Sequence, residues 1–79
     1  MKYKVESSWF PGDYGSWNRP YTEFDVLEEA VVFIKLNEPP PECEWNIKED
    51  KKLIAFTRVY YNELFVWEDG KLVKKKLRE

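Results

Sequence analysis

The second half of the chain alternates apolar and polar residues and is interrupted by turn-forming pairs, and this pattern restricts the possible folds more than any other feature. The strongest turn signal is Asp69-Gly70, which lies between two apolar runs and is typical of a two-residue β-hairpin. Asp50-Lys51 and Asn62-Glu63 are further turn candidates. Residues 43–77 are therefore predicted to form a four-stranded antiparallel meander.

Two-residue turns fix which residues lie opposite each other on neighbouring strands. A turn at Asp50-Lys51 places Ile47 opposite Ile54, so the two side chains share a face. A turn at Asn62-Glu63 places Tyr60 opposite Phe65. With the third hairpin added, one face of the predicted sheet collects Trp45, Ile47, Ile54, Phe56, Tyr60, Phe65, Trp67 and Leu72.

The opposite face of this predicted sheet is not cleanly polar. It carries an apolar strip centred on Val59, Val66 and Val73, and a single helix on the other face leaves that strip uncovered. Uncovered apolar strips are commonly interfaces. Two alternatives stay open, namely that the aromatic loop of residues 9–22 folds across the strip or that the register is wrong by one residue. The strip is therefore a second candidate surface for a protein partner or a homodimer.

One amphipathic helix is predicted over residues 25–36. Its apolar residues recur at helical spacing and share one face; they are Leu27, Ala30, Val31 and Ile34. Asp25 is placed to cap the free backbone N–H groups at the start of the helix, with Glu28 completing a capping box. Asn37 can end the helix.

The remaining segments complete a single domain spanning residues 1–79. Residues 1–8 alternate as a half-buried strand. Residues 38–42 include three consecutive prolines and form an extended connector. The predicted fold class is α+β, with the element order β-α-β-β-β-β and one helix packed on the meander sheet.

Residues 9–22 form an aromatic loop, because two Pro and two Gly interrupt any helix or regular strand there. A long loop with large rings is either a lid on the core or a contact surface. Trp, Tyr and Arg most often dominate binding energy at interfaces. The candidate protein-binding residues are Trp9, Phe10, Tyr14, Trp17, Arg19 and Tyr21. In the alternative interpretation, Trp9 and Tyr21 close the end of the core, and Tyr14 and Trp17 lie on the surface.

The sequence lacks most groups that enzymes use. It has no histidine and one cysteine, Cys43, so the commonest general base and the usual zinc ligands are missing. Its three glycines do not form a phosphate-binding loop. A carboxylate hydrolase built on Asp13 and Glu23 is the remaining enzymatic option. We expect no enzymatic activity, no metal and no cofactor.

Charge and hydropathy define the expected partners and compartment. The net charge is −2, which disfavours general nucleic-acid affinity. Five positive charges in residues 71–78 nevertheless leave a single-stranded nucleic-acid-binding protein as the alternative, with Tyr60, Phe65 and Trp67 stacking on bases and Lys74 opposite Phe65. The sequence shows no apolar run long enough for a membrane span and no signal peptide. A cytoplasmic location is expected, in the host cytoplasm if the protein is phage-encoded.

The function predicted from these features is that of a small, non-enzymatic protein-binding module. Its small size, acidic charge and high aromatic content are similar to those of phage-type accessory proteins and inhibitors that occlude a surface of a host protein. This is an analogy of composition and not a family resemblance.

Overall fold

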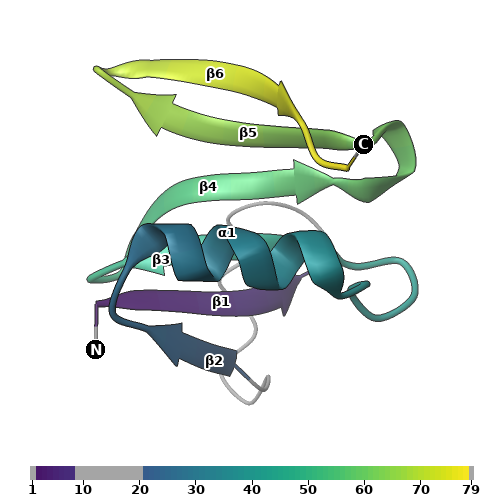
Figure 1. Cartoon of the computed structure of the whole chain (residues 1–79), viewed down its shortest axis with the longest axis horizontal. Coiled ribbons are helices and arrows are strands. Elements are labelled where there is room, and N and C mark those ends of the chain that lie inside the picture. The colour runs from purple at the N-terminus through teal and green to yellow at the C-terminus, as the bar shows by residue number, and fades with distance from the viewer. Residues whose placement is uncertain (1, 9–20, 79) are drawn as a thin grey trace.

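A computed structural model describes residues 2–8 and 21–78 of the chain, which form one antiparallel sheet with one α-helix against it (Figure 1). The strand order across the sheet is β2-β1-β3-β4-β5-β6. The elements are β1 (Tyr3–Ser8), β2 (Tyr21–Phe24), α1 (Leu27–Leu36), β3 (Glu44–Glu49), β4 (Lys52–Arg58), the short 3-10 helix η1 (Val59–Tyr61), β5 (Glu63–Glu68) and β6 (Lys71–Lys76). The predicted α+β class and the antiparallel meander are confirmed.

The strand β2 is an addition to the predicted element order, which becomes β-β-α-β-β-β-β. Its four residues pair with β1, from Tyr3 opposite Phe24 to Glu6 opposite Tyr21. Three of the four are exposed, so this edge strand lacks the apolar alternation that reveals a half-buried strand. Because β2 and β3 are both antiparallel to β1, they run parallel to each other, and α1 crosses over β1 to connect them.

The helix α1 begins two residues later than predicted and without the expected cap. Val26 is the N-cap residue, its backbone is extended, and no side chain caps the helix. The predicted capping by Asp25 and the capping box with Glu28 are therefore wrong, because the helix begins one residue too late for Asp25 to occupy the cap position. Asn37 ends the helix as predicted, and its Nδ2 donates a hydrogen bond to the carbonyl of Phe33 at 2.9 Å.

A bulge at Ile54 changes the predicted arrangement of the sheet. The Asp50-Lys51 turn forms, and Lys48 lies opposite Leu53 as expected. The next pair is Ile47 with Ala55, so Ile54 is an extra residue on β4. An extra residue moves every later side chain of a strand to the opposite face. Relative to β3, the predicted faces of β4, β5 and β6 are therefore inverted.

The core consequently lies between α1 and a different set of strand residues from the one predicted. Its buried members are Val5, Ala30, Ile34, Ile47, Ala55, Leu64, Val66 and Leu77. The aromatic side chain of Phe33 extends this core, since its ring lies 5.6 Å from that of Phe24 and 5.5 Å from that of Trp45. Trp45 also donates its indole N–H to the carbonyl of Asn37 at 2.9 Å.

The connection between β4 and β5 is longer than the predicted turn at Asn62-Glu63. It contains η1 followed by Asn62 in the left-handed conformation, so Phe65 lies opposite Phe56 and not opposite Tyr60. Asn62 also holds the C-terminal segment, because its side chain accepts a hydrogen bond from the backbone of Arg78 and donates one back, both at 2.8 Å. This attachment places the adjacent Leu77 in the core.

The Asp69-Gly70 hairpin forms as predicted, and it pairs Trp67 with Leu72 and Val66 with Val73. Both turn residues have positive φ, 53° for Asp69 and 77° for Gly70. Asp tolerates such an angle at the first turn position, and glycine adopts it without a steric cost at the second. We expect Gly70→Ala to lower the free energy of unfolding by about 1 kcal/mol, although a methyl group there would meet no atom within 4 Å. Urea denaturation would measure this change, and an unaltered midpoint would contradict the assigned turn.

Candidate functional site

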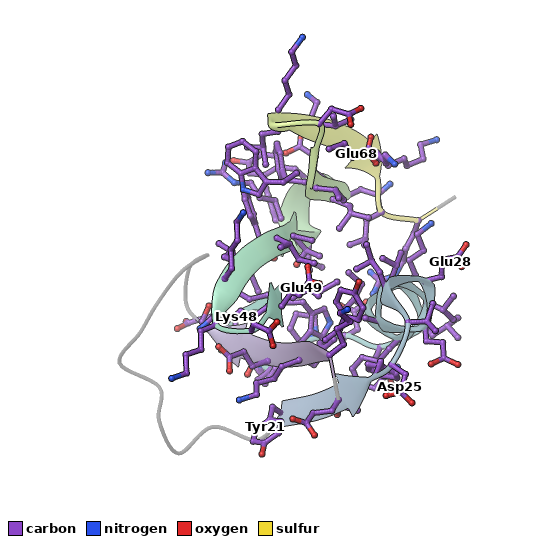
Figure 2. All side chains as sticks on the ribbon, turned by 90° about the vertical axis from the view of Figure 1, so that its left-hand side faces the viewer. Tyr21, Asp25, Glu28, Lys48, Glu49 and Glu68 are labelled. Atoms are coloured by element: carbon purple, nitrogen blue, oxygen red, sulfur yellow. The ribbon has the colours of Figure 1, made fainter. Side chains whose placement is uncertain are left out.

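The sheet has one face covered by α1 and one face that points away from it (Figures 1 and 2). Side chains alternate between the two faces along each strand. Because Ala55 and Val66 are opposite each other in the core, the neighbouring pair of Phe56 and Phe65 belongs to the face away from α1. We call this the open face, a name that means only that no helix of the described residues lies against it.

The part of the open face formed by β4, β5 and β6 carries four large apolar side chains, Phe56, Phe65, Trp67 and Leu72, which we call the aromatic strip. The rings of Phe56 and Phe65 stack with their centroids 4.9 Å apart and their planes at 17°. Trp67 and Leu72 are cross-strand partners that remain 47% and 43% exposed. Adjacent apolar side chains that stay exposed on a sheet, as Trp67 and Leu72 do beside the half-buried Phe56 and Phe65, mark a candidate interaction site.

Lys74 and Lys76 of β6 share the open face with the aromatic strip, whereas Lys71 and Lys75 are on the α1 side with Val73. Lys74 lies opposite Phe65 and makes an ion pair with Glu63 at 3.4 Å. Among the residues that the structure describes, Lys71 and Lys76 on the same strand have no ion-pair partner. Residues 52–78 contain seven Lys and Arg against three Asp and Glu. This end of the molecule is therefore positively charged although the whole chain is acidic.

The other part of the open face, on β1 and β3, is polar and fixed by internal contacts. Glu6 and Lys48 form an ion pair at 2.7 Å with both side chains largely buried. Beside them, Asn46 donates a hydrogen bond to the hydroxyl of Ser8 at 2.5 Å, and both residues are fully buried. Figure 2 shows Lys48 on the side of the sheet opposite α1. We assign these contacts to the stability of the sheet.

Most of the predicted loop site cannot be placed. Trp9, Phe10, Tyr14, Trp17 and Arg19 lie outside the described residues. Tyr21 is described, and it is the first residue of the edge strand β2, where it is 54% exposed and has the ammonium of Lys4 4.3 Å from its ring centroid.

The predicted second apolar face has a different position from the one expected. Val66 is 7% exposed and belongs to the core, Val59 packs against it, and Val73 is the cross-strand partner of Val66. These three residues therefore lie on the α1 side. A groove of about 420 Å³ between α1 and the β5–β6 hairpin is lined by Val66 together with Leu27, Val31 and Leu64.

The predicted register assigns all four residues of the aromatic strip to the core, and it gives only Phe65 and Trp67 a binding role, as stacking rings in the nucleic-acid alternative. The available signal is the apolar character of both faces of the predicted sheet, which is compatible with an interface, with coverage by the aromatic loop or with a register error. One alternative left open was a register error of one residue, and the bulge at Ile54 is such an error.

Searches for other kinds of site and for related proteins gave no match. In the described residues, no group of three or more His, Cys, Asp or Glu side chains could hold a metal ion, and no helix is long and apolar enough to cross a membrane. No protein-family model matches the chain, and comparisons with curated proteins and with solved structures also found no match. A functional proposal therefore depends on the geometry of the chain itself.

Proposed function

We propose that the chain is a non-enzymatic protein-binding module whose contact surface is the aromatic strip. The observation that carries this proposal is the half-exposed pair of Trp67 and Leu72 next to the stacked rings of Phe56 and Phe65. Interface energy is concentrated in a few aromatic and apolar side chains surrounded by polar residues. The strip and the lysines beside it have this composition.

The aromatic strip fits a protein better than it fits single-stranded nucleic acid. Bases stack on free faces of aromatic rings. Phe56 and Phe65 stack on each other, so one face of each ring is already covered, and only Trp67 and the outer faces remain. The net charge of −2 also disfavours a polyanion. The lysines beside the strip are the observation that favours nucleic acid, and an oligonucleotide is therefore included as an alternative ligand in the test.

The mode of action that we propose is occlusion, in which the module covers a surface of its partner without chemical change. A phage-type inhibitor of a host protein would act in this way. The sequence also predicts that the loop residues Trp9 and Trp17 contact a partner. This stays a separate prediction, which the aromatic strip does not test.

A double substitution, Trp67→Ser with Leu72→Ser, tests the proposed function. We expect the variant to stay folded, because both side chains are nearly half exposed, and to bind a captured partner at least about tenfold more weakly. Tagged wild-type and variant proteins would be passed through a lysate of the source organism, and retained proteins would be quantified by mass spectrometry.

The matched control is Tyr60→Ser, since Tyr60 is 89% exposed and lies outside the strip. It should leave retention unchanged. Equal retention by the double variant and the wild type would contradict the proposal. Retention of oligothymidylate that disappears with modest added salt would favour the nucleic-acid alternative.

A further inference from the structure

Among the strands that the structure describes, β6 (Lys71–Lys76) is the last in the sheet, and none of them pairs with its outer edge. In a hairpin with a two-residue turn, the pair next to the turn exchanges both backbone hydrogen bonds, and hydrogen-bonded pairs then alternate with non-hydrogen-bonded pairs. The pair next to the Asp69-Gly70 turn is Glu68 with Lys71. Leu72, Lys74 and Lys76 consequently direct their N–H and C=O groups away from β5, toward the outer edge.

The charged side chains along this edge are all positive. Four of the six residues of β6 are lysines, and the other two are Leu72 and Val73. Lys75 is paired with Glu68 at 2.6 Å and Lys74 with Glu63 at 3.4 Å. Lys71 and Lys76 are not paired within the described residues. A strand that pairs with β6 would therefore meet unneutralised positive charge at both ends of the edge.

We propose that β6 accepts an extended acidic segment of a partner protein as a seventh strand, with apolar residues of that segment lying beside Leu72 and the aromatic strip. This inference rests on the proposed function, because it names the kind of partner that the module binds. Main-chain hydrogen bonds give such strand addition its affinity, and side chains at alternate positions give it specificity. Charge complementarity to the lysines selects acidic residues in the added strand.

A second copy of the chain is a poorer occupant of the same edge. In the antiparallel registers that pair most of β6 with β6 of another copy, lysines lie opposite lysines. Like charges directly opposite each other in a sheet are destabilising. Lysines on an edge strand oppose this kind of self-association, whereas they attract an acidic strand.

The probe for this proposal is a fluorescent synthetic peptide, Glu-Glu-Glu-Val-Val-Glu, which places glutamates opposite the lysines and valines opposite Leu72 and Val73 in an antiparallel register. We expect it to bind and to slow hydrogen exchange at the amides of Leu72, Lys74 and Lys76. The same peptide with N-methyl groups on the amides that would pair with β6 has identical charge but lacks the donors for strand addition. It should bind at least about tenfold more weakly.

Substitution of Lys74 separates strand addition from simple charge attraction. Proline is tolerated on an edge strand where its missing N–H faces outward, so Lys74→Pro should keep the fold and weaken peptide binding at least about tenfold. Lys74→Ala removes the charge alone, and we expect it to weaken binding by about threefold or less. Heteronuclear NMR spectra of both variants would verify that the sheet is intact.

Three results would overturn the proposal. Equal binding of the unmodified and N-methylated peptides would show charge attraction without strand addition. Protection of the same amides by oligothymidylate, but not by the acidic peptide, would assign the edge to nucleic acid. Concentration-dependent protection without peptide would assign it to a second copy.

Retention of a natural partner by the variants distinguishes failure of strand addition at β6 from failure of the proposed protein-binding function. If the partner is lost with Trp67→Ser and Leu72→Ser but retained by Lys74→Pro, the aromatic strip binds without strand addition. If both variants retain the partner, the proposed function fails as well.

Discussion

Replacing Val66 with aspartate should unfold the protein or lower its free energy of unfolding by about 4 kcal/mol or more, whereas the same substitution at the adjacent Trp67 should cost about 1.5 kcal/mol or less. Val66 is 7% exposed and lies in the core, so its replacement places a carboxylate in apolar surroundings. Trp67 is 47% exposed on the open face, where a carboxylate stays hydrated. Guanidinium denaturation followed by far-UV circular dichroism would measure both variants.

This pair of variants tests directly which face of β5 contacts α1. Val66 and Trp67 are adjacent in sequence, and their side chains point to opposite faces of the sheet. Without the bulge at Ile54, Trp67 would lie in the core. Trp67→Asp would then lower the free energy of unfolding more than Val66→Asp. Greater damage from Trp67→Asp than from Val66→Asp would therefore restore the predicted face and remove the aromatic strip from the surface.

Ile47→Ala is expected to lower the free energy of unfolding by about 3 kcal/mol. The side chain of Ile47 is fully buried in the centre of the sheet, between Val5 on β1 and Ala55 on β4. Deleting buried methyl and methylene groups costs their transfer free energy together with that of the cavity left behind. For a domain of this size, such a loss is a large fraction of the total stability.

The control for Ile47→Ala is Val32→Ala on the outer side of α1. Val32 is 52% exposed, and alanine is the better helix former. We expect the stability of this variant to lie within about 0.5 kcal/mol of the wild type. Similar losses for Ile47→Ala and Val32→Ala in thermal denaturation would contradict the position assigned to the core.

The local signals in the sequence predicted most of the fold. Helical spacing from Leu27 to Ile34 and the Asp69-Gly70 turn each correspond to a strong local preference, and both elements form as predicted. The strand β2 was missed because its residues are mostly exposed, which leaves no alternation to detect. The cap at Asp25 failed because an N-cap is defined by where the helix begins, and that position depends on packing.

The position of the candidate site could not be predicted from local sequence signals in the way that the helix and the Asp69-Gly70 hairpin could. Its location depends on which face of β4 contacts α1, and a single extra residue at Ile54 decides that face. A bulge is favoured by the packing of the finished sheet and has no sequence signature as strong as a turn. The same apolar side chains of Phe56, Phe65 and Trp67 therefore suggest a core when the bulge is ignored and a surface when it is included.

Nuclear Overhauser contacts around Ala55 and Phe56 are the most direct test of the central claim, which is that the bulge at Ile54 turns the aromatic strip away from α1. We expect the methyl group of Ala55 to show contacts to side chains of the core and the ring of Phe56 to show contacts to that of Phe65 without any to α1. Contacts between the Phe56 ring and Ile34 of α1 would place Phe56 in the core and contradict both the open face and the function proposed for it.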